Sequence, residues 1–152
     1  MLAQPVPGTA EITDRSGMFE YNPEIIAEFR ANGGRVGGRF ATMDLALLTT
    51  IGARTGLPRT TPVVYFTDGA AIFVIASAAG SDRHPAWYHN LLANPKLTVE
   101  VGTDAYQAVA TSTEGQERTR LFAKAVASQP GFGEYKAKTR RRIPVLRIER
   151  II

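Results

Sequence analysis

The chain has 152 residues, enough for one domain with a buried core, and its 44% hydrophobic and 21% charged residues are ordinary for a globular protein with a net charge of +4. It contains no cysteine, which excludes disulfides, thiolate metal sites and cysteine nucleophiles. No run approaches the roughly 18 apolar residues of a membrane-spanning helix, and residues 1–13 lack the basic start and apolar centre of a signal peptide.

Residues 1–35 are predicted to form an N-terminal arm and an amphipathic helix, and residues 36–152 the main domain. The cap pattern Asn22-Pro23 and the stop signal Asn32-Gly33-Gly34 predict that the helix spans residues 23–31. One side of this helix would be apolar, through Ile25, Ile26 and Phe29. It should therefore lie on the body of the protein or on a membrane surface.

Short strands follow from residue 42 onward. Apolar and β-branched runs between turn residues predict strands over 45–50, 60–67, 71–77, 96–101, 106–112 and 143–151. Asp68-Gly69 is a two-residue hairpin signal. Helices are expected over about 85–93 and 114–128, and the glycines at 131–133 should interrupt the chain. Because hairpins dominate, we expect an antiparallel, closed or nearly closed sheet with peripheral helices.

The turn-rich segment 52–59 is the strongest candidate for a phosphate site. Its two glycines let the backbone approach a ligand, Thr55 adds a hydroxyl, and Arg54 and Arg59 carry planar guanidinium groups suited to phosphate. The Gly-Lys-Ser/Thr ending of a Walker loop is missing. A plain hairpin loop with two solvated arginines remains the alternative.

Two further segments could border a ligand. Only small side chains occupy 77–81, where a flat ring or a phosphate could lie on the main chain, although these residues alone fit an ordinary strand-to-helix connection better. Trp87 and Asn90 would share one side of the next helix, where Trp87 either stacks beside a cofactor or packs in the core. His84 and His89 do not have the spacing of a zinc pair, so no metal site is predicted.

Few side chains in this sequence suit acid–base chemistry. Tyr65 and Tyr135 could donate a hydrogen bond to a carbonyl or nitro oxygen of a substrate, or could be half-buried packing residues. No Ser–His–Asp arrangement and no pair of carboxylates is legible. Any chemistry is therefore expected to come from a cofactor that the protein orients.

Basic residues gather in two stretches that should attract a polyanion, or else form a solvated face. They are Arg30, Arg35, Arg39, Arg54 and Arg59, and Lys136, Lys138, Arg140, Arg141, Arg142, Arg147 and Arg150. A nucleic-acid partner is not expected, because the run 136–142 has no interleaved aromatic residue. An acidic lipid surface or a small ligand with phosphate and carboxylates stays open.

Taken in order, these segments resemble the deazaflavin-dependent nitroreductase family, whose members use coenzyme F420. The matching stretches are 29–38, 47–56, 59–63, 76–77, 85–91, 93–95 and 135–145. They cover most of the chain. The loop of the family often reads Gly-Arg-Lys-Ser-Gly, and here Ala53, Arg54 and Thr55 stand at its three central positions.

The resemblance implies an α+β fold that is mainly β, a split β-barrel of the FMN-binding-like kind, with a deazaflavin whose tail carries a phosphate and glutamates. The implied cofactor-binding residues are Arg54, Thr55, Gly56, Arg59, Thr60, Pro62, Ser77, Ala78, Ala79, Gly80, Pro85, Ala86, Trp87 and Asn90. The implied reaction is hydride transfer from the reduced cofactor to a quinone, nitroaromatic or activated alkene. Candidate catalytic residues are Tyr65, Ser77 and Tyr135.

Two alternative functions remain: an FMN-binding split-barrel oxidase or flavin reductase, and a carrier that binds the deazaflavin without turnover. The expected protein is cytoplasmic, as a monomer or a homodimer. Peripheral membrane contact through the helix over 23–31 is a further hypothesis, because quinones reside in membranes.

Overall fold

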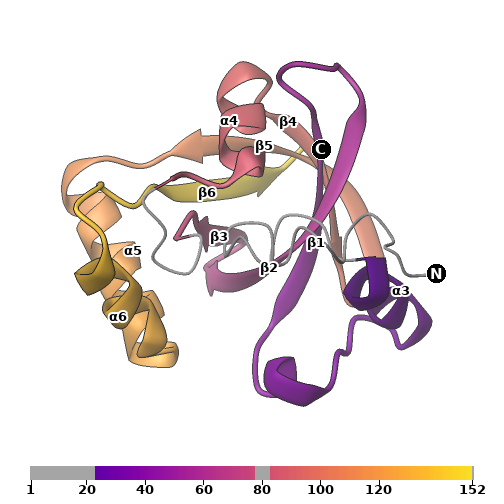
Figure 1. Cartoon of the computed structure of the whole chain (residues 1–152), viewed down its shortest axis with the longest axis horizontal. Helices are drawn as coiled ribbons and strands as arrows, with labels where there is room; N and C mark the ends of the chain where they lie inside the picture. The colour runs from indigo at the N-terminus through magenta and orange to yellow at the C-terminus, as the bar shows by residue number, and fades with distance from the viewer. Residues whose placement is uncertain (1–22, 78–82, 152) are drawn as a thin grey trace.

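The computed structural model describes residues 23–77 and 83–151, apart from the side chain of Arg39 (Figure 1). Predictions on residues 1–22 and on Ala78, Ala79 and Gly80 lie outside the described residues. Six antiparallel strands close into a barrel in the order β1-β2-β3-β6-β5-β4. They are β1 (Leu45–Ile51), β2 (Pro58–Asp68), β3 (Ala71–Ile75), β4 (Lys96–Val101), β5 (Asp104–Ser112) and β6 (Val145–Arg150). The predicted antiparallel barrel is confirmed.

The described helices lie around this barrel. They are α3 (Pro23–Ala31), the 3-10 turn η2 (Gly38–Phe40), α4 (Ala86–Ala93), α5 (Gly115–Ser128) and α6 (Gly131–Lys138). In Figure 1, α5 and α6 lie on one side of the barrel and α3 on the other. No helix of the described part of the chain is both long and apolar enough to cross a membrane.

Helix α6 corrects the expectation that the glycines at 131–133 interrupt the chain. Gly133 packs on α5, where a Cβ atom would stand 3.5 Å from a Val126 methyl group. The Phe132 side chain is buried in the cluster that α5 forms with the barrel. Tertiary packing therefore outweighs the low helix propensity of glycine here.

The side chains of each strand alternate between two faces, so the barrel has an inner and an outer layer. The inner cluster contains Ala46, Leu48, Val63, Val74, Val99 and Leu146, together with Trp87 and Leu91 of α4. An outer cluster under α5 and α6 contains Phe66, Phe73, Ile75, Leu121 and Phe132. A second outer cluster under α3 contains Ile26, Phe29, Phe40, Leu45 and Leu47.

Helix α3 uses its apolar side against the barrel. Ile26 and Phe29 are buried in the outer cluster that includes Leu47. Arg30 donates two hydrogen bonds to the Glu100 carboxylate, at 3.1 Å from Nε and 2.8 Å from Nη2. This ion pair ties α3 to β4. Because Ile26 and Phe29 are buried, two of the three apolar residues that suggested a membrane contact are covered by the protein itself.

Asp68, at the end of β2, joins the barrel to α5. Its carboxylate accepts hydrogen bonds from Arg120 at 3.0 Å, from Arg147 at 2.9 Å and from Lys124 at 3.4 Å. These contacts, with those of Arg120 and Arg147 the largest, hold the pKa of Asp68 well below its usual range. Asp68 therefore stabilises the folded state while it is ionised, and this contribution is lost as the pH falls.

We predict that Asp68→Asn lowers the melting temperature at neutral pH, because three cations lose their shared anion. The difference from wild type should shrink below about pH 4, where the unfolded-state aspartate takes up its proton. Thermal melts followed by circular dichroism across the pH range measure this difference. Asp104→Asn is the matched control, since Asp104 pairs with Arg150 in an exposed position and should matter little. A difference in melting temperature between wild type and Asp68→Asn that does not change with pH would contradict the stabilising role of the ionised Asp68 carboxylate.

Candidate functional site

The hairpin between β1 and β2 forms the loop that was predicted to bind phosphate. Gly56 has a φ of +70°, a conformation that favours glycine. A Cβ atom on Gly52 would stand 2.6 Å from the Thr55 hydroxyl, so this position also requires glycine. The Leu57 amide donates a hydrogen bond to Thr55 Oγ1 at 3.2 Å. The two glycines therefore serve the turn itself, and the Thr55 hydroxyl proton can still be donated to a ligand.

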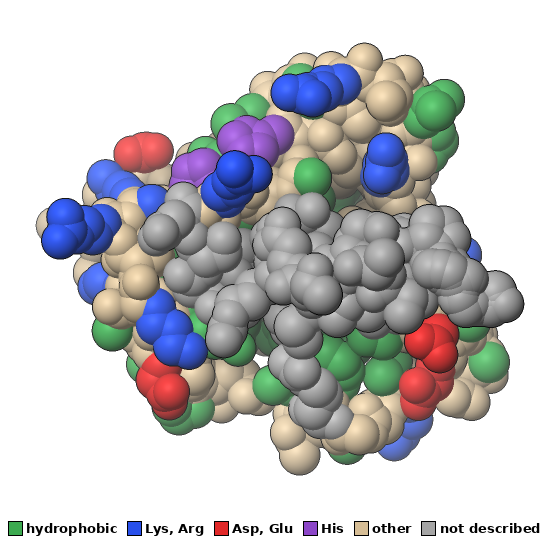
Figure 2. Space-filling model, viewed as in Figure 1, with side chains coloured by type: hydrophobic (Ala, Val, Ile, Leu, Met, Phe, Trp, Pro, Cys, Tyr) green, Lys and Arg blue, Asp and Glu red, His purple; other side chains and the backbone are tan. Residues whose placement is uncertain are grey.

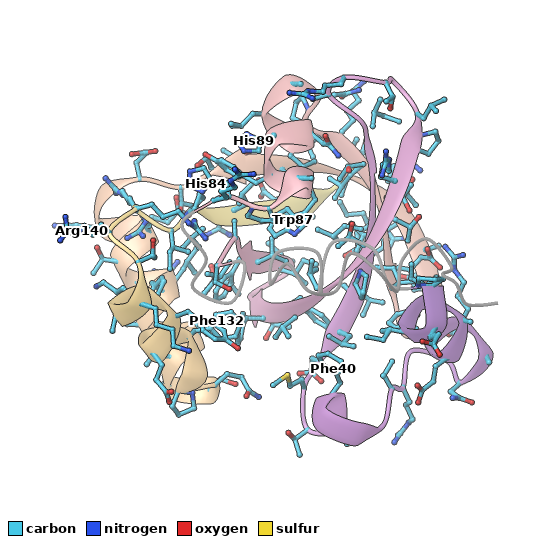
Figure 3. All side chains as sticks on the ribbon, viewed as in Figure 1. Phe40, His84, Trp87, His89, Phe132 and Arg140 are labelled. Atoms are coloured by element: carbon cyan, nitrogen blue, oxygen red, sulfur yellow. The ribbon has the colours of Figure 1, made fainter. Side chains whose placement is uncertain are left out.

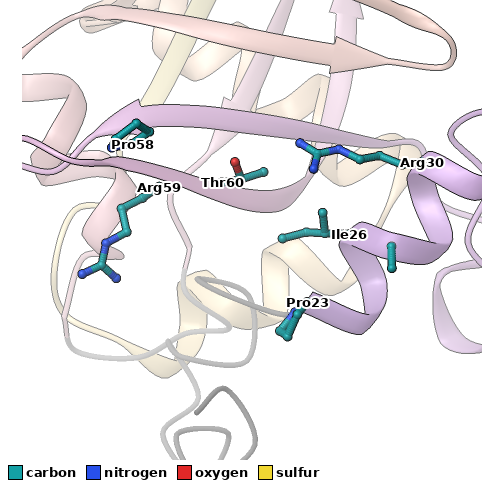
Figure 4. Close-up of a pocket in the computed structure, with 7 residues that line it drawn as sticks. Pro23, Ile26, Arg30, Pro58, Arg59 and Thr60 are labelled. Atoms are coloured by element: carbon teal, nitrogen blue, oxygen red, sulfur yellow. The ribbon is translucent and has the colours of Figure 1, made fainter. Parts of the chain in front are cut away.

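Arg54 and Arg59 of this hairpin are both exposed. The ion pairs found within residues 23–77 and 83–151 do not include either of them. Arg59 and Thr60 line a groove of about 570 Å³ between β2 and α3 (Figure 4). The other lining residues are Pro23, Ile26, Ala27, Arg30 and Pro58. The hairpin thus presents the exposed guanidinium groups of Arg54 and Arg59, and Arg59 lies at the groove.

Asn90 of α4 holds the hairpin in place. Its side chain is buried, with 8% of the residue exposed. The Ala53 amide donates to Asn90 Oδ1 at 2.9 Å, and Asn90 Nδ2 donates to Thr50 Oγ1 at 3.0 Å. Both polar atoms of the Asn90 side chain thus have protein partners, so the structure gives Asn90 a role in shaping the loop, and its contact with a cofactor stays a prediction.

We predict that Asn90→Ala lowers the free energy of unfolding by about 2–4 kcal/mol, because it leaves a buried hydroxyl and a backbone amide without a partner. Urea denaturation measures this loss. Leu92→Ala is the control on the same helix, since Leu92 is 58% exposed. Equal stability of the two variants would show that the Asn90 hydrogen bonds do not hold the hairpin.

Thr60 and Pro62 lie on the outer face of β2, and Ser77 follows the end of β3. The pairing of β2 with β3 runs from Tyr65–Val74 to Asp68–Ala71, and β3 ends at Ile75, two residues before Ser77. Pro62 and Ser77 are both buried. Thr60 shares a hydrogen bond of 2.8 Å with the Thr49 hydroxyl on this face. The structure therefore places Thr60 and Pro62 on one face of β2, whereas Ser77 lies beyond the paired part of β3.

A residue that sequence reasoning missed organises the end of β3. Arg141 donates to the carbonyl oxygens of Ala76 and Ser77, at 3.0 and 2.6 Å, and contacts His84 Nδ1 at 2.8 Å. The sequence showed it only as one of several cations in the run 136–142. Its partners lie 57 to 65 positions away, and no local pattern signals them.

The three candidate catalytic residues are not on one face. Tyr65 faces the inner cluster, opposite to its neighbours at even positions of β2. Burial, with the charges of Asp44 and Tyr106, raises its pKa. Tyr135 packs in the outer cluster under α6, its ring 5.5 Å from that of Phe132. Tyr135 is thus on the outer side of the barrel and Tyr65 on the inner side, and Ser77 lies just after the end of β3.

Trp87 is 4% exposed and belongs to the inner cluster. Its side chain points from α4 toward the barrel (Figure 3). The structure thus favours the packing role over the stacking role considered above. Pro85, just before α4, is buried, and Ala86 is exposed.

The charge of the site is basic. Figure 2 shows Lys and Arg side chains along the side of α5 and α6 and near the β1–β2 hairpin, with the histidines between them. Across the described ranges, no group of three or more His, Cys, Asp or Glu residues is placed to hold a metal ion. The arrangement suits a ligand with several negative charges.

Comparison with known proteins agrees with this geometry. The family described as F420H(2)-dependent quinone reductase matches residues 23–149. The F420H(2)-dependent quinone reductase Rv1261c of Mycobacterium tuberculosis is 34% identical over 128 residues, which cover 82% of this chain and 86% of that protein.

Solved structures show the same fold. The F420-H2 dependent reductase FDR-A is 36% identical with a TM-score of 0.65, over 70% of this chain and 94% of that one. A protein described as a domain-swapped dimer is 32% identical with a TM-score of 0.67, over 95% of this chain and 99% of that one. More distant heme-binding and oxidase-like proteins share the barrel alone. The expected split β-barrel is confirmed.

Proposed function

Because this chain belongs to the F420H(2)-dependent quinone reductase family, we propose that it transfers a hydride from reduced coenzyme F420 to a small organic acceptor, a quinone first of all. Nitroaromatics and activated alkenes are further candidate acceptors. The observation that carries the proposal is the β1–β2 hairpin, whose Arg54 and Arg59 are exposed and belong to none of the ion pairs among the described residues. The cofactor and the reaction are inferred from the family, and the residues that would bind the cofactor are inferred from the structure of the hairpin.

The residues present fit such a cofactor. Arg54, Arg59 and the Thr55 hydroxyl would hold its phosphate, since guanidinium forks match phosphate oxygens. The surface formed by Thr60, Pro62 and Ser77 would support the part of the cofactor that carries the ring. When bound, the deazaflavin supplies the hydride that none of the protein side chains could supply.

The protein itself would position the acceptor and stabilise the charge that develops on it. Tyr135, which packs on the outer cluster under α5 and α6, and Ser77, just after β3, are the first candidates to donate a hydrogen bond to an acceptor oxygen. Tyr65 is the third candidate, and its place among the inner residues makes it the least favoured. Solvent or the Tyr135 hydroxyl would deliver the proton.

We predict that Tyr135→Phe and Ser77→Ala each lower kcat/KM for a soluble quinone by about tenfold or more, because each removes one donor. Oxidation of the reduced cofactor, followed by its absorbance, measures the rate. The dissociation constant for coenzyme F420, measured separately, should change less than about threefold. If both variants keep the wild-type kcat/KM, the assignment of these two residues is wrong.

Two finer predictions stay open to experiment. The chain is expected to be a monomer or a homodimer, which sedimentation equilibrium distinguishes. The hypothesis of membrane contact through α3 is weakened, because two of the apolar residues that suggested it, Ile26 and Phe29, are buried against the barrel. Co-sedimentation with anionic liposomes would restore that hypothesis. FMN remains the alternative cofactor.

A further inference from the structure

We propose that Arg141 is a positioning residue of the cofactor site, which fixes the backbone at Ser77 and ties it to His84 at the foot of α4. The inference rests on the proposed function. Arg141 lies between α6 and β6, away from the residues of β2 that are proposed to contact the cofactor. Arg141 would act through the carbonyl groups of two consecutive residues and through one imidazole nitrogen.

The geometry of the guanidinium group carries this role. The pairing of β3 with β6 ends at Ile75 and Val145, and one more hydrogen bond joins the Ala76 amide to the Pro144 carbonyl. The carbonyl oxygens of Ala76 and Ser77 then accept from Arg141 Nη1 and Nη2. Arg141 thus continues, with its side chain, the contact between the end of β3 and the segment before β6.

Three acceptors surround one planar group, and this set of partners suits arginine alone. A lysine ammonium is a single point with one nitrogen, and it cannot span two neighbouring carbonyls and an imidazole in the same plane. Charge-assisted hydrogen bonds of this kind are among the stronger ones in proteins. Ser77, whose carbonyl oxygen accepts one of these bonds, is buried and lies just after β3.

His84 makes this contact sensitive to acid. Arginine has donors only, so the 2.8 Å contact requires an unprotonated Nδ1 on His84. Among the described residues, the groups facing His84 are Arg141, Tyr88, with its ring centroid at 4.8 Å, and His89 at 5.8 Å. Burial, followed by the charges of Arg141 and His89, lowers the pKa of His84. The contact is therefore intact at neutral pH, and protonation replaces it with two adjacent positive charges.

Fluorescence titration with coenzyme F420 tests the proposal on the wild type, Arg141→Lys and His84→Asn. Arg140→Lys is the matched control, since Arg140 is exposed and points outward in Figure 3. At about pH 7.5, Arg141→Lys should raise the Kd about tenfold and Arg140→Lys less than about twofold. His84→Asn should bind nearly as tightly as wild type, because the asparagine oxygen can accept from Arg141.

The pH profile separates positioning from a general loss of structure. Between about pH 7.5 and 4.5, a window that extends below the usual histidine range because burial lowers the pKa of His84, the wild-type Kd should rise several-fold relative to that of His84→Asn, whose acceptor does not titrate. Titration of the cofactor itself affects both proteins and cancels in the ratio. A constant ratio over this range, or an Arg141→Lys Kd equal to wild type, would overturn the inference alone. A wild-type protein that does not bind coenzyme F420 would overturn the proposed function and, with it, this role of Arg141.

Discussion

Replacing Arg54 and Arg59 together with alanine is expected to raise the Kd for coenzyme F420 at least about a hundredfold. Hydrogen bonds to a charged group contribute about 1.5–3 kcal/mol each, and every 1.4 kcal/mol is a tenfold change in Kd. Both arginines are exposed, and neither belongs to an ion pair among the described residues. Their removal should therefore affect the ligand and leave the fold unchanged. Fluorescence titration at fixed salt measures the effect.

Two controls sharpen this test. Arg30→Ala removes an arginine of the same groove that Glu100 already engages, and it should change the Kd less than about threefold. A truncated deazaflavin without the phosphate tail should bind the double variant as it binds the wild type. If both ligands lose affinity equally, the arginines shape the loop, and the phosphate assignment is wrong.

Trp87→Ala is expected to lower the free energy of unfolding by about 3–5 kcal/mol, the usual cost of removing a large buried aromatic side chain. The ring is 4% exposed and packs in the inner cluster with Leu91. Trp87→Phe keeps most of this contact and should cost clearly less. Urea denaturation measures the free energy of unfolding of both variants. Unfolding is followed by circular dichroism, because both variants lack the only tryptophan of the chain and hence its fluorescence.

The same pair of variants decides between the two roles considered for Trp87. If the ring packs in the core, Trp87→Phe should bind coenzyme F420 within about threefold of wild type. A Trp87→Ala variant of normal stability that has lost the cofactor would contradict packing and favour stacking beside the cofactor ring.

Local signals in the sequence were enough to predict the barrel. Asp68-Gly69 predicted the hairpin of β2 and β3, and the strand runs predicted six strands that the structure contains. Helix α6 was missed, because Gly131 and Gly133 have low helix propensity, and the burial of Phe132 against α5 and the barrel, which stabilises this helix, depends on residues distant in the sequence.

The candidate site was predicted less completely than the fold. The loop with Arg54 and Arg59 stands out in the sequence through its glycines. Asn90 was expected to meet a cofactor, whereas both of its polar atoms hold the protein. Arg141 could not be found, since its role depends on partners at least 57 positions away. Side chains alternate between the two faces of a strand, so residues three positions apart lie on opposite faces. This alternation along β2 could have shown from the sequence that Tyr65 and Pro62 do not share a face.

The most direct test of the account is titration of the purified apoprotein with coenzyme F420 and, separately, with FMN, following ligand fluorescence. We expect tight binding of the deazaflavin and weak binding of FMN, followed by quinone-dependent oxidation of the reduced cofactor. Tighter binding of FMN would contradict it and favour the FMN-dependent oxidase or flavin reductase.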